Sequence, residues 1–134
     1  MADSFKFELV SPERLLFSES VESVLVPGTE GEMTVMAHHA PVMSSVKPGL
    51  VVAKSAAGVE HRFVVFGGFV DVLPDSCTLL AESAVNVADL NRDDLARRIQ
   101  EAREDLADAS TDEDRTKAET LLQQLTTLES AVAA

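Results

Sequence analysis

Residues 26–49 read VPGTEGEMTVMAHHAPVMSSVKPG, and they hold three of the five prolines and three of the six glycines of the chain. Short apolar runs lie between these residues. A Pro-Gly pair followed by a second Gly favours a tight reversal, because Gly accepts positive φ and Pro fixes its own φ. The stretch therefore predicts short strands that meet at sharp corners. Its loops carry Glu30, Glu32, His38 and His39, so we expect function on these rims.

Alternating apolar and polar residues continue on both sides of this stretch, as expected of half-buried strands. The predicted strands are Phe5–Val10, Leu15–Phe17, Val21–Val26, Met33–Met36, Val42–Val46, Leu50–Lys54, Val59–Phe66, Phe69–Leu73 and Cys77–Ala81. The turn signals between them include Lys47-Pro48-Gly49, Ala57-Gly58, Gly67-Gly68 and Pro74-Asp75-Ser76. Short strands at even spacing predict an antiparallel sandwich or a flattened barrel. A parallel sheet is disfavoured, because no helical segment between the strands could form a crossover.

The composition changes near residue 90, since every Gly, Pro and Phe lies before it. After it, Leu95, Ile99, Ala102 and Leu106 recur at helical spacing. Asn91 is placed to cap this helix, and Ser110 with Glu113 forms a capping box for a second helix. The fold class is therefore α+β, with an antiparallel β-sandwich over residues 1–87 and a two-helix hairpin over 88–134.

Charge and composition restrict the function of the chain. Its 134 residues carry a formal net charge of −12, so nucleic acid is not an expected partner. One cysteine excludes an internal disulfide. The N-terminus shows neither a signal nor a transit pattern, and no apolar run has the roughly 20 residues that span a bilayer. We expect a cytoplasmic protein without direct membrane insertion, which could still be a peripheral part of a membrane complex.

Motifs for chemistry are lacking, so we predict no catalytic residue, no cofactor and no metal site. Cys77 has no second Cys and lies in an apolar strand pattern, which indicates a buried, inert thiol. His38 and His39 are adjacent, and in a strand their side chains would point to opposite faces, which disfavours one shared metal. The interpretations left open are packing beside Pro41, exposure on the rim and, for His39, an interface hydrogen bond.

Two further pairs have more than one interpretation. Glu30 and Glu32 could be solvated turn charges, contacts to a partner loop, or, with His39, an acid–base site; an acid–base site would need an apolar pocket that the local sequence does not offer. Gly67-Gly68 could form a bulge or a hairpin turn, or could let another backbone come close. The residues alone describe a two-part binding protein, or a stand-alone adaptor domain, rather than an enzyme.

Several short motifs together resemble the epsilon subunit of bacterial F-type ATP synthases. They run almost without gaps through the predicted sheet and are weaker over residues 91–134, where the resemblance rests on the hairpin plan. The matching residues are Val10-Ser11-Pro12-Glu13, Leu16-Phe17-Ser18, Val21-Glu22, Gly28 with Glu30-Gly31-Glu32, His39-Ala40-Pro41, Lys47-Pro48-Gly49, Gly67-Gly68 and Leu79 with Ala81-Glu82.

This resemblance implies a sandwich of about ten strands followed by two helices. It implies a non-catalytic subunit of the central rotor stalk that links the gamma subunit to the c-ring and couples proton transport to ATP synthesis. Such a subunit lies at the cytoplasmic face of the bacterial inner membrane. By analogy, residues Thr29, Glu30, Gly31 and Glu32 would face the c-ring, and residues His39, Pro41 and Met43 would face gamma.

The resemblance also raises regulation as an alternative function. In many bacteria the two helices extend toward the alpha and beta catalytic subunits and block ATP hydrolysis, and some members bind ATP through a Leu/Ile-Asp-x-x-Arg-Ala motif. Here that place reads Leu90-Asn91-Arg92-Asp93-Asp94-Leu95. Asp94 stands where the motif has Arg, and an acidic residue there disfavours a phosphate. The hairpin is also acidic, which argues against an inhibitory segment.

Overall fold

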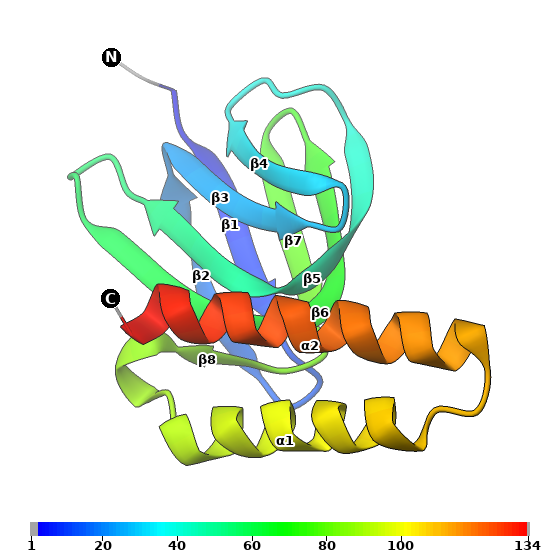
Figure 1. Cartoon of the computed structure of the whole chain (residues 1–134). Coiled ribbons are helices and arrows are strands. Elements are labelled where there is room, and N and C mark those ends of the chain that lie inside the picture. Colours follow the sequence, from blue (N-terminus) through cyan, green and yellow to red (C-terminus); the bar gives the residue numbers. More distant parts are fainter. Residues whose placement is uncertain (1–2, 134) are drawn as a thin grey trace. The chain divides into compact units, whose positions relative to one another are not determined.

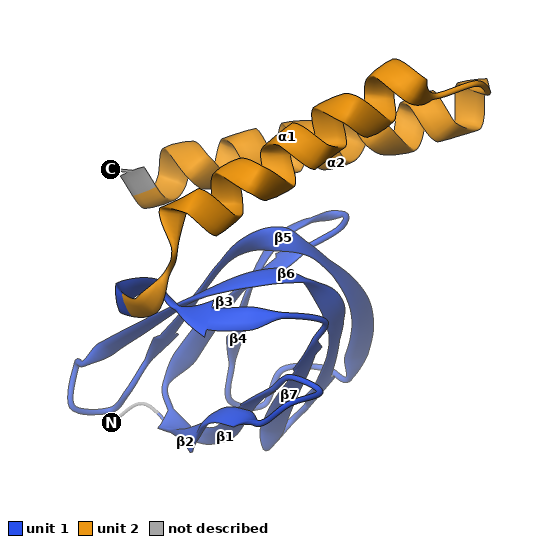
Figure 2. Cartoon of the chain, turned by 90° about the horizontal axis from the view of Figure 1, so that it is seen from below, with its two compact units in different colours: residues 1–88 blue, residues 89–134 orange. Residues whose placement is uncertain are grey.

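The structure is a computed structural model that describes residues 3–133. The chain divides into two compact units, residues 1–88 and residues 89–134, which Figure 2 shows in different colours. The first unit contains the strands and the second contains two helices (Figure 1).

Eight strands form the sheet of the first unit among the described residues. They are paired in the order β2-β1-β7-β6-β5-β3-β4, with β8 paired to β6. Their bounds are β1 Phe5–Val10, β2 Leu15–Val21, β3 Ser23–Gly28, β4 Gly31–Met36, β5 Val42–Lys54, β6 Glu60–Leu73, β7 Ser76–Ala81 and β8 Ala84–Asn86. A short 3-10 turn, Val87–Asp89, follows β8.

Strands β5 and β6 are long and curved, and each contributes to both layers of the sandwich (Figure 2). The pairs Val46–Gly68 and Pro48–Phe66 keep one register through the curve. The interpretation of Lys47-Pro48-Gly49 and Gly67-Gly68 as turns that separate strands is therefore wrong. The sandwich class is confirmed, with eight strands instead of about ten. The nine strands predicted from alternation become seven, because two predicted pairs are joined, and the eighth, β8, was not predicted.

Glycines permit the backbones to approach closely where the long strands curve. Gly68 has a φ of +144°, and a Cβ on it would lie 2.2 Å from the carbonyl oxygen of Leu80. A Cβ on Gly49 would lie 2.6 Å from the Cβ of Pro27 on β3. Of the interpretations of Gly67-Gly68, close approach of another backbone is the one that the structure supports.

One pair of strands is parallel, which the antiparallel prediction did not include. Strand β1 pairs with β7 in parallel, with Phe7 opposite Cys77 and Leu9 opposite Leu79. The connection from β1 to β7 runs through β2–β6, so the intervening strands supply the long crossover that a parallel pair requires. All other strand pairs in the described sheet are antiparallel.

Inward-facing residues of the strands form the core. Phe5, Phe7 and Leu9 alternate with more exposed residues, as their spacing predicts. The core also includes Phe17, Val21, Val24, Val26, Val35, Val46, Val51, Ala53, Phe63, Val65, Val70, Val72, Cys77, Leu79 and Ala81. At its margin, the ring of His61 lies 4.9 Å from that of Phe17, centroid to centroid. His61 is thus accounted for by packing.

The second unit is a hairpin of α1, Arg92–Asp108, and α2, Asp112–Ala133. The two helices are antiparallel, and the Arg92 guanidinium near the start of α1 donates a hydrogen bond to the Val132 carbonyl near the end of α2 (3.3 Å). Their buried residues are Leu95, Ile99, Ala102, Ala118, Leu125 and Leu128. No helix within residues 3–133 is long and apolar enough to cross a membrane.

The cap of α1 is confirmed and that of α2 is shifted by one residue. The Asn91 side chain accepts hydrogen bonds from the backbone N–H groups of Asp93 and Asp94. For α2 we predicted a box of Ser110 and Glu113. Instead, the Thr111 hydroxyl oxygen accepts from the Asp114 N–H at 3.0 Å. Thr111 and Asp114 can cap the unpaired N–H groups of the first turn as Ser110 and Glu113 would. Two cap positions one residue apart therefore differ little in free energy.

Candidate functional site

The loop between β3 and β4 is a two-residue turn at residues 29 and 30. Gly28 pairs with Gly31, and the Thr29 N–H donates to the carbonyl of Ser45 on β5 (3.0 Å). Gly31 has a φ of +137°, and a Cβ on Gly28 would lie 2.8 Å from the Gly31 carbonyl oxygen. The tight turn therefore depends on both glycines, and it holds residue 30 at the tip of a hairpin tied to a third strand.

The carboxylates of this turn are solvated. Glu30 and Glu32 are both exposed, and a paired acid–base mechanism would need an apolar pocket around one of them. Neither residue lines the pockets around Ser11, around Met43 or around Asp105. No cluster of three or more His, Cys, Asp or Glu residues suited to a metal occurs within residues 3–133. This turn is an exposed hairpin tip that is suited to contact another surface.

The two adjacent histidines have separate environments. His38 has a φ of +66°, its backbone N–H donates to the Pro74 carbonyl (2.7 Å), and its Nε2 lies 2.8 Å from an Asp3 carboxylate oxygen. His39 is half-buried, and its Nδ1 lies 2.7 Å from the Ala40 carbonyl. Because a carbonyl only accepts, Nδ1 of His39 carries the proton in this contact. Its Nε2 makes no hydrogen bond within residues 3–133 that the structure records.

An apolar groove opens on the outer side of strands β5, β6 and β7. It has a volume of about 730 Å³, and its lining includes Pro12, Met43, Ser45, Phe69 and Leu80. Three large apolar side chains at the groove are exposed to solvent: Met43 is 70% exposed, Phe69 54% and Leu80 56%. Phe69 pairs with Ser45 on one side and Leu80 on the other, so the groove crosses β5, β6 and β7.

Of the three residues predicted to face gamma, one lines this groove. Met43 lines it, while Pro41 and His39 precede Met43 along the exposed segment that leads into β5. The sequence analysis did not identify Phe69 and Leu80, which lie in predicted strands but point outward. The sequence feature that could have identified them is their position in the strand alternation. Each is next to a core residue, Val70 and Leu79 respectively, and therefore faces outward. Exposed apolar residues at outward positions are typical of interaction surfaces.

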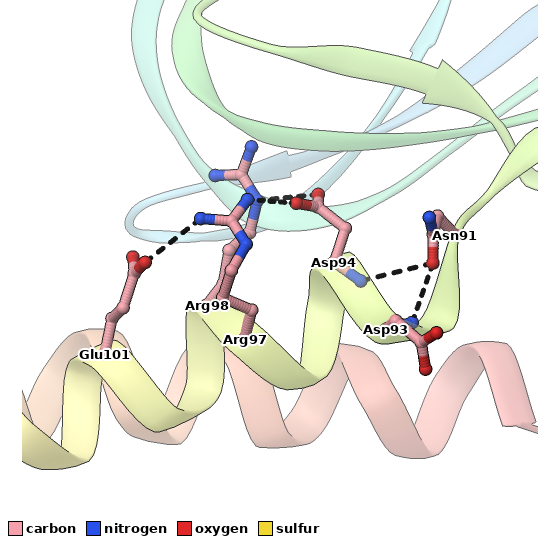
Figure 3. A network of polar contacts seen from close by, with 6 residues as sticks. All are labelled: Asn91, Asp93, Asp94, Arg97, Arg98 and Glu101. Carbon is pink, nitrogen blue, oxygen red and sulfur yellow. Dashed lines mark hydrogen bonds and ion pairs between the residues drawn. The ribbon is translucent and has the colours of Figure 1, made fainter.

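Ion pairs between side chains of α1 surround the first turns of this helix (Figure 3). Asp94 accepts hydrogen bonds from Arg97 and from Nε of Arg98, the latter at 3.2 Å, and Arg97 also contacts Glu101 at 3.0 Å. The hydrogen bond from Arg97, opposed in part by desolvation and aided by Arg98, lowers the pKa of Asp94. The hydrogen bond to Asp94 in turn raises the pKa of Arg97. Asp94 thus sits within a local network of cations from its own helix.

Cys77 is the buried, inert thiol that the sequence predicts. It is 1% exposed, on β7 within the core. Desolvation by burial, with a smaller contribution from the nearby charge of Asp71, raises its pKa to about 12. A thiol with this pKa is not a nucleophile near neutral pH.

Comparison with known proteins gives this architecture a family. The family model of the ATP synthase Delta/Epsilon chain beta-sandwich domain matches residues 4–87. Two solved structures share the fold. A chain of the Euglena gracilis mitochondrial ATP synthase aligns with a TM-score of 0.77 and 24% identity, over 96% of this chain and 81% of that chain. A chain of the Tetrahymena thermophila mitochondrial ATP synthase central stalk and c-ring aligns with a TM-score of 0.68 and 13% identity, over 93% and 96%.

Sequence relatives are much closer. The ATP synthase epsilon chain of Mesorhizobium japonicum is 70% identical over 132 residues, which cover 98% of both chains. That of Chelativorans sp. is 61% identical over the same shares. The β-sandwich followed by a helical hairpin therefore defines a chain of the Delta/Epsilon class. More narrowly, the chain belongs to the ATP synthase epsilon chain family.

Proposed function

We propose that the chain is a non-catalytic rotor subunit that joins the gamma subunit to the c-ring and couples proton transport to ATP synthesis. The observation that carries this proposal is the exposed groove lined by Met43, Phe69 and Leu80. Full burial of one such side chain contributes about 1.5–3 kcal/mol. In the isolated chain these three side chains are exposed, so most of that free energy would be gained only when a partner buries them.

The groove is the proposed gamma surface. It includes Met43, and we extend the surface to His39 and Pro41, which lie just before β5. The unshared Nε2 of His39 suits a hydrogen bond to the partner. The proposed c-ring surface is the turn formed by Thr29, Glu30, Gly31 and Glu32, whose exposed, glycine-dependent geometry suits a rigid contact.

A rotor subunit of this kind would lie peripherally at the cytoplasmic face of the bacterial inner membrane. It would bind neither nucleic acid nor lipid directly, in keeping with its net charge of −12. Regulation through contacts of the hairpin with the alpha and beta subunits, with or without bound ATP, is less supported. Asp94, at the place of the motif arginine, directs a carboxylate toward Arg97 and Arg98, and both of these cations are engaged by it instead of by a phosphate.

Reconstitution tests the proposal. Membranes whose ATP synthase lacks its epsilon subunit receive the full chain, and ATP synthesis driven by a proton gradient is measured. We expect the chain to restore synthesis and Met43→Asp to need roughly tenfold more protein, because about 1.4 kcal/mol of binding corresponds to that factor. Val59→Asp is the matched control, since Val59 is 52% exposed but lies in the β5–β6 loop.

Two results would contradict the proposal. One is a failure of the wild-type chain to restore synthesis at any concentration. The other is hydrolysis of ATP by the isolated chain at a rate above that of buffer.

A further inference from the structure

A row of polar and acidic side chains runs beside the groove on the same outer face. Asp71 pairs with Met43 on β5 and with Thr78 on β7, and Thr78 pairs with Glu8 on β1. Directly paired residues share a face of the sheet. Asp71 is two residues from Phe69, and Glu8 is in the same row as Asp71. The row therefore parallels the apolar row of Phe69 and Leu80.

The spacing of these rows follows from sheet geometry. Neighbouring strands are about 4.8 Å apart, so Asp71 on β6 and Glu8 on β1 are separated by roughly 10 Å across β7. Residues two apart along a strand are separated by roughly 7 Å, so both carboxylates flank the groove at one side. The outer face thus presents an apolar strip with two acids along one border.

These two acids have no ion-pair partner in the part of the chain that the structure describes. Among residues 3–133, neither Asp71 nor Glu8 forms an ion pair with a basic side chain. Asp71 is exposed and Glu8 is half-buried. Lys6 is the one basic residue on the same outer face of β1, and it lies beyond Glu8, away from the groove. The border of the groove is therefore acidic and available to an external cation.

We infer that the partner segment that fills this groove is amphipathic and carries Lys or Arg side chains along one flank, opposite Asp71 and Glu8. This inference rests on the proposed function, and it assigns that segment to the gamma subunit. Apolar contacts alone specify position weakly, whereas charge pairs at the border of an interface select the partner, set its register and accelerate association. An acidic border also repels anionic lipid headgroups and phosphate backbones, which favours a basic protein segment as the occupant.

The test measures binding of the full chain to purified gamma subunit at low and high salt. The double variant Glu8→Lys/Asp71→Lys should weaken binding roughly 30-fold or more at low salt, since like charges across an interface cost several kcal/mol. The loss should shrink to a few-fold in roughly 0.5 M salt, where exposed charges are screened. Glu60→Lys is the control, because Glu60 is exposed at the other end of β6, and it should change binding less than twofold.

A milder variant keeps the inference testable if the double variant folds poorly. Asp71→Asn removes one charge without changing shape, and it should weaken binding several-fold at low salt and not at high salt. Equal binding of wild type, Asp71→Asn and the double variant would overturn the inference while leaving gamma as the partner. A wild-type chain that does not bind gamma at all would instead overturn the proposed function and the inference with it.

Discussion

At the scale of single residues, the strongest constraints on this chain are places where a side chain would collide with backbone. Gly68 combines a φ of +144° with a neighbouring carbonyl oxygen 2.2 Å from where a Cβ would be. Gly58 has a φ of +82° in the β5–β6 loop, but no atom lies within 4 Å of its Cβ position. The two glycines therefore separate the cost of backbone strain from the cost of a collision.

Substitution of these glycines by alanine provides the first stability prediction. Gly58→Ala should lower the free energy of unfolding by about 1 kcal/mol, the cost of a left-handed conformation for an L-residue. Gly68→Ala should lower it by about 3 kcal/mol or more, because the β6–β7 ladder must also separate. Urea unfolding of the two variants and of wild type measures both values. Equal losses of unfolding free energy in the two variants would mean that β7 moves away from residue 68 at no energetic cost, which would contradict the prediction.

At the scale of secondary-structure elements, the first turn of α1 is stabilised by charged side chains. The cap by Asn91 and the pairing of Asp94 with Arg97 and Arg98 hold that turn. Asp94 also lies near the positive end of the helix dipole. Its pKa is lowered from the ordinary value of 3.8 in the folded chain, so the ionised form stabilises the helix.

The lowered pKa of Asp94 predicts a pH-dependent contribution to the hairpin. A depressed carboxyl pKa contributes stability that is present above the unfolded value of 3.8 and is lost as the pH falls through the lower, folded value. Amide exchange of α1 should therefore be slower in wild type than in Asp94→Asn near pH 6, and this difference should shrink as the pH falls below 3.8. A difference that persists at acidic pH would show that the ionised carboxylate is not the cause. Glu104→Asn, farther along α1, serves as the control.

Elements were easier to predict than the way in which they join. The strand positions follow from alternation, and the capped start of α1 follows from Asn91 and the acidic first turn. Two pairs of predicted strands are continuous in the structure, because Pro48 and Gly67 occur inside curved strands and not at their ends. Alternation within a window reports which face is buried, but it does not report whether a glycine ends a strand or bends it. The shift of the α2 cap from Ser110 to Thr111 is a boundary effect of the same kind.

At the scale of the whole molecule, function depends on residues that the chain brings together from distant positions. The groove takes Met43 from β5, Phe69 from β6 and Leu80 from β7. The pattern of the sequence marks each as an outward residue of a strand, but only strand pairing makes them neighbours. The parallel pairing of β1 with β7 adds Glu8 to the same face. Such a surface could not be predicted from local sequence. Met43 was predicted to face gamma from the family resemblance alone.

If the groove is the gamma surface, the β-sandwich should bind gamma without the hairpin. The measurement is the dissociation constant of purified gamma for the full chain and for a chain that ends at residue 90. We expect the two constants to agree within about threefold, because the groove and the residues before β5 belong to the first unit. A truncated chain that folds but binds gamma more than about a hundredfold more weakly would contradict it, since the contact would then depend on the hairpin.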